Sequence, residues 1–252
     1  MKKNRIDILI DSLSAEFAKI PNFEMTQTDS DANKLFNFIL TKFSDINDFK
    51  TLYKRYYIPA TNKAIVEAKN EIRSSYYRKI LDVSDEQLKE NYYDTIRLGY
   101  VGLFHKVENY VKDLLIHVNM IFNEGKTGAN SIEKFFEKKY EFKFTNWHSN
   151  IHLNKINWIC NCVKHYDGYP KKEPKYRYLS HLPEEEKIKI HHNDFFKDIE
   201  YVAEVYYQIK LTQILSLSLF KIATDNLSES DLSDDLSHSY KILEDKIKLL
   251  MT

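Results

Sequence analysis

The sequence has little glycine, proline or cysteine, and no excess of charge of either sign. Of its 252 residues, 5 are glycine and 5 are proline. A β-rich chain of this length needs many more turn residues, so their scarcity favours long helices. The 2 cysteines, Cys160 and Cys162, lie too close together to cross-link distant segments, which fits a reducing compartment. The composition therefore predicts an all-α fold and argues against a disulfide scaffold.

Neither a net charge nor a long hydrophobic run is present. Lysine and arginine total 37, as do aspartate and glutamate. This balance gives no overall field that attracts nucleic acid or an anionic membrane, so any RNA contact must be local. A membrane-spanning helix needs about 18 consecutive apolar residues, and no such run occurs. The N-terminal segment also lacks the continuous apolar stretch of a signal peptide. We expect a cytoplasmic protein with no membrane partner.

Hydrophobic residues recur at helical spacing along most of the chain, separated by short polar breaks. Ser84, followed by Gln87, resembles a capping box and opens the longest periodic segment. The late helix has an apolar stripe that includes Phe196 and Ile199. The predicted helices cover 3–20, 30–43, 45–57, 59–81, 85–123, 131–139, 147–166, 194–224 and 240–250.

These helices divide the chain into three predicted parts. The first part, 1–83, is an N-terminal helical subdomain, and the second part, 84–224, is a helical bundle. The third part, 225–252, combines an acidic, serine-rich linker with an amphipathic C-terminal helix.

The stretch "NWICNCVKHYDGYP", residues 157–170, combines poor helix formers with a helical hydrophobic pattern. Gly168 suits a left-handed turn after the helix, and Pro170 prevents the helix from continuing. At about 100° per residue, polar side chains at steps of three or four share one helix face. The members of this polar row are Asn150, Asn154, Asn157, Asn161 and His165.

Residues of metal-ligand type are also frequent in this region. Cys160 and Cys162 would point about 160° apart on a helix, so they cannot both bind one zinc ion. A cysteine nucleophile paired with His165 is poorly placed, since only Cys162 approaches the edge of that face. We therefore predict that both cysteines pack as small hydrophobic side chains. We also predict no metal and no cofactor.

The motif Asn161-Cys162-Val163-Lys164-His165-Tyr166-Asp167-Gly168 resembles the Asn-x-x-x-His-x-x-Gly signature of HEPN domains (higher eukaryotes and prokaryotes nucleotide-binding). In this helical family the motif ends a long helix that follows a long core helix. The segment 96–118 looks like that core helix, and 194–224 looks like the closing helix. The resemblance covers about 85–224 and implies that the part over 84–224 is a HEPN-like helical bundle.

Many HEPN domains are metal-independent endoribonucleases of toxin–antitoxin or antiphage systems. Arginine and histidine side chains from two subunits meet across a dimer interface, where the histidine moves protons and the arginine holds the scissile phosphate. This division suits RNA cleavage by the 2′-hydroxyl group, which needs a proton shuttle and a cation. The resemblance implies that His165 is the general acid–base and that Asn161 orients it or the phosphate. It also implies a homodimer and a cognate antitoxin or defence-system partner.

The sequence departs from the family pattern at Cys160, which stands where the family has its arginine. A cation for catalysis would have to come from elsewhere, and the candidates are Arg97, Lys155, Lys164 and Arg177. Basic and aromatic residues of the following loop could bind single-stranded RNA. The candidate substrate-binding residues are Asn157, Lys164, Lys171, Lys172 and Arg177.

Two other interpretations remain open. Glutamates dilute the positive charge of the loop, so the loop could simply be a solvated surface. The alternative function is that of a catalytically inactive helical protein, which works by protein–protein interaction or dimerisation.

Overall fold

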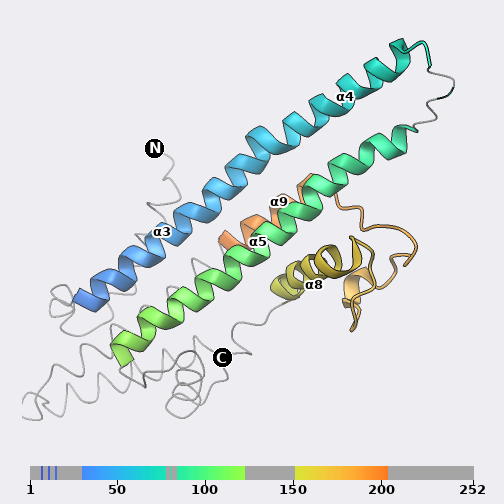
Figure 1. The fold of residues 1–252 in the computed structure, drawn as a ribbon. Coiled ribbons are helices and arrows are strands. Elements are labelled where there is room, and N and C mark those ends of the chain that lie inside the picture. Colours follow the sequence, from blue (N-terminus) through green and yellow to red (C-terminus); the bar gives the residue numbers. More distant parts are fainter. Residues whose placement is uncertain are drawn as a thin grey trace, which may run out of the picture. The chain divides into compact units, whose positions relative to one another are not determined.

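The computed structural model describes residues 30–77, 80, 84–122 and 151–203, together with the single positions 7, 11 and 15. All regular secondary structure in these residues is helical (Figure 1). The predicted all-α fold is therefore confirmed for the described part of the chain. The predicted helices over 131–139 and 240–250 and the linker over 226–239 lie outside the described residues, as does most of 3–20.

The described helices fall in two regions of the sequence, one before and one after the gap at 123–150. None of them combines the length and the apolar character that crossing a membrane requires. In chain order they are α3 (Ser30–Leu52), the π-helical turn η1 (Tyr53–Tyr57), α4 (Ile58–Ser74), α5 (Asp85–Phe122), α8 (Ile151–Tyr166), the 3₁₀ turn η2 (Arg177–Leu179) and α9 (His192–Tyr201).

α3, η1 and α4 follow one another without interruption, as Figure 1 shows. The polar break predicted between 43 and 45 is therefore wrong. Ser44 is exposed, whereas Phe43, Ile46 and Phe49 are buried and continue the apolar stripe past it. Serine is only a moderately poor helix former, so burial of this stripe decides the local structure.

α4 ends at Ser74, earlier than the predicted end at 81. The next residue, Ser75, is extended (φ −65°, ψ 137°), and its hydroxyl accepts a hydrogen bond from the backbone N–H of Tyr77 at 3.1 Å. Serine side chains can replace helical hydrogen bonds by such local bonds, and here the bond accompanies the end of the helix.

α5 begins with the predicted capping box. The backbone N–H of Ser84 donates to Oε1 of Gln87 at 2.8 Å, and the N–H of Gln87 donates to Oγ of Ser84 at 3.2 Å. These reciprocal bonds satisfy donors that have no partner inside the helix. The helix then continues to Phe122.

The described residues belong to two compact units. The first unit includes 30–45 and 108–122, where the hydroxyl of Tyr110 donates to Asp45 at 3.2 Å. Burial, assisted by the Asp45 carboxylate, raises the pKa of Tyr110. The second unit comprises the described residues of 46–107 and 151–201 and contains every candidate site residue that the structure describes. The domain boundaries at 83 and 224 stay predictions.

The core of the second unit is built around the ring of Phe195, which is fully buried. Its centroid lies 5.1 Å from that of Tyr53 and 4.9 Å from that of Tyr100. Gly99 permits this packing, because a Cβ atom there would lie 2.4 Å from Cζ of Phe195. The apolar stripe predicted for the helix over 194–224 is wrong at Phe196, which is only half-buried. Phe195 lies on the same helix face as Asp198 and Ile199, which are buried one turn further on. Phe195 therefore packs in the core instead of Phe196.

A buried carboxylate, Asp198 of α9, joins three helices of this unit. It accepts hydrogen bonds from the hydroxyl of Tyr100 on α5 at 2.5 Å and from Nζ of Lys155 on α8 at 2.6 Å. Because the Asp198 side chain is only 4% exposed, these bonds must replace its hydration. Burial and the Asp198 charge raise the pKa of Tyr100 well above its ordinary value. The position of α8 is thereby fixed against α5 and α9.

Candidate functional site

Helix α8 ends in a turn that contains two residues in the left-handed region. Asp167 has φ 52° and Gly168 has φ 84°. The N–H of Gly168 donates to the carbonyl of Cys162 at 3.0 Å, which closes the end of the helix. The predicted stop at Gly168 is confirmed. The left-handed conformation of Asp167 was not indicated by the sequence.

Arg97 of α5 lies directly against this turn. A Cβ atom on Gly168 would lie 2.9 Å from Cδ and 3.1 Å from Nε of Arg97. The guanidinium is buried, and it donates to the carbonyl of Ile188 at 2.9 Å and to Asp94 at 2.5 and 3.1 Å. It also pairs with Glu90. The N–H of Ile188 in turn donates to the carbonyl of Gly168 at 2.8 Å. Arg97 therefore holds the turn, and its charge is neutralised away from solvent.

The polar row on α8 forms in part. Nδ2 of Asn161 donates to Oδ1 of Asn157 at 2.6 Å and to its carbonyl at 2.9 Å. His165 lies one turn further on, is exposed, and forms no hydrogen bond or ion pair with the described residues. The amide of Asn161 is thus directed to Asn157 and does not orient the imidazole. His165 is accessible to a ligand.

The two cysteines are buried and form no disulfide bond with each other, as their predicted packing role requires. Burial raises the pKa of Cys162, although the backbone N–H groups of Lys172 and Lys171 oppose the shift. A raised pKa lowers the thiolate fraction and with it the reactivity of the sulfur. Across the described residues, no group of three or more His, Cys, Asp or Glu side chains is arranged to hold a metal ion.

The loop after α8 runs back along the helix. The hydroxyl of Tyr176 donates to the carbonyl of Ile151, the first residue of α8, at 2.9 Å. His165 lies in the last turn, about 20 Å further along the helix axis at 1.5 Å per residue. Arg177 therefore lies near the opposite end of α8, and the structure does not bring it to His165.

The three predicted substrate-binding lysines lie closer than Arg177 to the C-terminal half of α8. Lys164 belongs to its last turn, and Lys171 and Lys172 follow the left-handed turn. The indole N–H of Trp158 donates to the carbonyl of Lys172 at 2.8 Å, which holds this part of the loop on the helix. Nζ of Lys171 lies 5.2 Å from the ring centre of Tyr169. None of the three lysines forms an ion pair within the described part of the chain.

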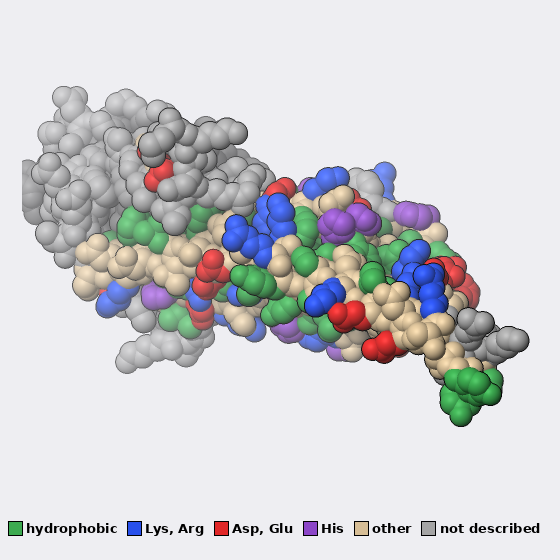
Figure 2. Space-filling view, turned by 90° about the horizontal axis from the view of Figure 1, so that it is seen from above, with side chains coloured by type: hydrophobic (Ala, Val, Ile, Leu, Met, Phe, Trp, Pro, Cys, Tyr) green, Lys and Arg blue, Asp and Glu red, His purple; other side chains and the backbone are tan. Residues whose placement is uncertain are grey.

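Other charges on α8 and in the turn after it are compensated. Nζ of Lys187 lies 2.8 Å from Asp167, and its hydrogen bond and charge lower the pKa of that carboxyl group. Lys155, a candidate cation for catalysis, is held by Asp198. Elsewhere on the molecule, Figure 2 shows basic and acidic side chains interspersed over the face in view. The predicted cations of the site that form no ion pair in the described part of the chain are thus Lys164, Lys171 and Lys172, and of these Lys171 interacts at longer range with Glu184.

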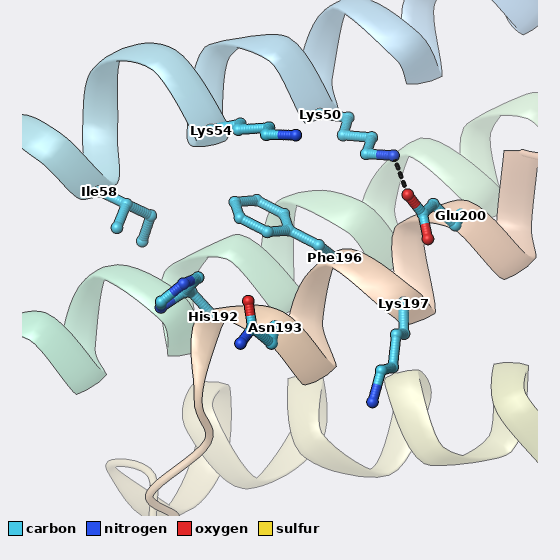
Figure 3. Close-up of a pocket in the computed structure, with 8 residues that line it drawn as sticks. All are labelled: Lys50, Lys54, Ile58, His192, Asn193, Phe196, Lys197 and Glu200. Carbon is cyan, nitrogen blue, oxygen red and sulfur yellow. Dashed lines mark hydrogen bonds and ion pairs between the residues drawn. The ribbon is translucent and has the colours of Figure 1, made fainter.

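A further candidate site, which is concave, was missed by sequence reasoning. A cavity of about 480 Å³ lies between the segment from α3 to α4 and helix α9 (Figure 3). Lys50 and Lys54, four residues apart on one helix face, were the local signal that could have indicated it. Lys197, on a helix more than 100 residues later in the chain, gave no such signal.

Comparison of the chain with models of known protein families, with curated proteins and with solved structures gave no match. The resemblance to HEPN domains thus depends on the motif over 161–168 and on the order of the helices around it. The function has to be inferred from the chemistry of the sites.

Proposed function

We propose that the C-terminal end of α8 and the loop after it bind single-stranded RNA, within a HEPN-like component of a bacterial toxin–antitoxin or antiphage defence system. One observation supports the RNA contact. Lys164, Lys171 and Lys172 form no ion pair within the described residues, although Lys171 acts at longer range on the charge of Glu184, and the exposed Tyr166 lies close to Lys164 in sequence. Ammonium groups of this kind neutralise phosphates, and exposed rings stack on unpaired bases.

The same site is better equipped to bind RNA than to cleave it. Exposed His165 can accept a proton, but cleavage through the 2′-hydroxyl also needs a cation on the developing phosphorane. Arg97 is paired with Asp94 and Lys155 is paired with Asp198, so these carboxylates compete with a phosphate for the two cations. Arg97 is also buried. Lys164 is the remaining candidate in the same turn as His165. We therefore propose RNA binding as the main function, with metal-independent cleavage by His165 as a property to be tested separately.

The binding proposal is tested by fluorescence anisotropy with a labelled single-stranded RNA at several salt concentrations. Replacing Lys164, Lys171 and Lys172 by alanine should weaken binding and lower the slope of log K against log salt by about 2, at about 0.7 per lost phosphate contact. The matched control replaces Lys63, Lys89 and Lys112, three exposed lysines outside the site. Equal losses in the site variant and the control, or no RNA binding by the wild type, would refute the proposal.

Cleavage is tested by incubating the same RNA with the protein in EDTA and separating the products on a denaturing gel. Intact RNA with wild-type protein supports binding alone. Products that disappear with His165→Ala assign the proton transfer to His165. Products that persist with this variant exclude His165 as the general acid–base.

A second candidate function, protein–protein interaction, is favoured by α4. Of its 17 residues, Ile58 and Ile65 are buried, whereas Val66 is 56% exposed and the nearby Tyr56 is 60% exposed. Contiguous exposed apolar patches mark contact surfaces, and we propose that these side chains belong to such a patch, for a homodimer or a defence-system partner. Light scattering should then give a dimeric mass for the wild type and a monomeric mass for Val66→Asp, with Lys63→Ala as the control. A monomeric wild type would remove the support for a homodimer.

A further inference from the structure

The cavity between the segment from α3 to α4 and helix α9 lies within the second unit and uses no residue of the α8 site. Its volume of about 480 Å³ falls in the range of small-molecule sites, which is about 300–1,000 Å³. Three lysines line it, Lys50, Lys54 and Lys197, against a single carboxylate, Glu200. The cavity therefore favours an anionic ligand.

One of these lysines is free to meet a ligand. Lys50 pairs with Glu200, and Nζ of Lys197 lies 3.5 Å from Asp194. Lys54 forms no ion pair with the described residues, and Figure 3 shows its ammonium group directed toward the same side of the cavity as that of Lys50. A phosphate group between Lys50 and Lys54 would supply the missing counter-charge.

The backbone around Lys54 is unusual in a way that points to a site. Lys54 belongs to the π-helical turn η1, which connects two α-helices. Isolated π turns are rare and occur frequently at functional sites. Because a π turn contains more residues than an α turn, Lys50, Lys54 and Ile58 can remain on the face directed at α9. All three line the cavity (Figure 3).

The remaining walls are suited to an aromatic group with hydrogen-bonding edges. Figure 3 shows the half-buried ring of Phe196 reaching from α9 toward the segment that carries Lys54. The backbone N–H of His192 donates to the hydroxyl of Tyr92 at 3.0 Å, and that hydroxyl lies 2.6 Å from Nδ1 of the same histidine. Either of these two atoms can be the donor, because the neutral ring of His192 carries its proton on Nδ1 or on Nε2. Burial, with the charge of His191, lowers the pKa of His192 and favours this neutral form.

We propose that this cavity binds a free nucleoside monophosphate. The phosphate lies between Lys50 and Lys54, and the base stacks on Phe196 with its polar edge toward His192 and Asn193. Charge at one end and a flat apolar surface next to hydrogen-bonding groups at the other match this class of ligand. The site is additional to the proposed RNA contact on α8 and shares no residue with it.

The test is isothermal titration of the full chain with AMP, adenosine and ribose 5-phosphate. AMP should bind at least about tenfold more tightly than either of the other compounds, since each of them lacks one half of the recognised groups. Lys54→Ala should weaken AMP binding by about tenfold, the loss of one charge-assisted hydrogen bond. Lys63→Ala is the control, because Lys63 is 78% exposed on α4 and does not line the cavity.

A second variant tests the ring separately. Phe196→Leu should lower the affinity for AMP but leave that for ribose 5-phosphate unchanged, while an unaltered circular dichroism spectrum shows that the fold is retained. The proposal is overturned by wild-type protein that does not bind AMP, by equal affinity for AMP and ribose 5-phosphate, or by an equal loss in Lys54→Ala and Lys63→Ala. Displacement of AMP by one equivalent of single-stranded RNA would also overturn it. RNA binding that survives in Lys54→Ala separates this site from the one on α8.

Discussion

Replacing Gly168 by alanine should destabilise the end of α8 through two separate effects. The first is backbone strain, since Gly168 has φ 84° and a side chain in the left-handed region costs about 1–2 kcal/mol. The second is a steric effect, because the new Cβ atom would lie 2.9 Å from Cδ and 3.1 Å from Nε of Arg97. Arg97 cannot simply move aside, as its guanidinium is buried and bonded to two carboxylates and a carbonyl.

The sum of these effects sets the expected magnitude. Overpacking a well-filled site costs about 1–3 kcal/mol, so with the backbone strain Gly168→Ala should lower the free energy of unfolding by about 2–5 kcal/mol. The measurement is urea unfolding followed by the fluorescence of Trp158, which is buried on α8. A Trp147→Phe background removes the only other tryptophan.

A double-mutant cycle separates the two effects. In an Arg97→Ala background the contact is absent, so Gly168→Ala should cost only the backbone strain, and the coupling free energy should be about 1–3 kcal/mol. Gly102→Ala is the matched control, since its Cβ atom would lie 3.2 Å from Phe49 within a regular helix. At position 102, the gain of about 1 kcal/mol in helix propensity opposes the destabilisation caused by the tight contact with Phe49. Zero coupling between positions 97 and 168 would refute the packing of Arg97 against the turn.

Three further predictions concern the helices that position the sites. Ser84→Ala should lower the free energy of unfolding by about 1 kcal/mol, because α5 loses its N-cap bond, and wild-type stability in urea would contradict the capping box. Asp198→Ala should cost about 3–5 kcal/mol, since Lys155 loses its buried counter-charge, while Asp198→Asn should cost less in the same assay. Burial raises the pKa of Tyr53 to about 12. In the unfolded chain, the phenol of Tyr53 loses its proton at about pH 10. The contribution of Tyr53 to the free energy of unfolding is therefore fully present below about pH 10 and decreases toward pH 12. Tyr53→Phe should flatten this decline in urea unfolding at alkaline pH, and an unchanged pH dependence would show that Tyr53 is not its source.

Local features of the helices could be predicted from the sequence. The capping box at Ser84 and the stop at Gly168 each depend on residues within a few positions, and the structure has both. The error near Ser44 has a physical cause. Ser44 is a single exposed polar residue, whereas the buried apolar stripe extends on both sides of it and keeps the helix continuous.

Contacts between distant segments could not be predicted in the same way. Nothing in the spacing indicates that Arg97 packs on Gly168, 71 positions later, or that Lys54 and Phe196 line one cavity. At α9, periodicity could not separate Phe195 from Phe196, because adjacent aromatic residues lie only about 100° apart on a helix. Only the positions of α5 and η1 decide that Phe195 is the residue in the core.

Cys160 and Arg97 together are the reason that we propose RNA binding rather than RNA cleavage. Cys160 stands where the resembling family has arginine, but its side chain is buried, so an arginine there would have to place its charge in the core of the unit. Arg97 reaches the same end of α8 from another helix, yet its guanidinium is occupied by Glu90 and Asp94. It acts as a positioning residue, because it holds the turn from which Lys171 and the loop depart. We therefore propose that a phosphate at this end is held by Lys164, Lys171 and Lys172, which suit a flexible strand better than a single scissile group.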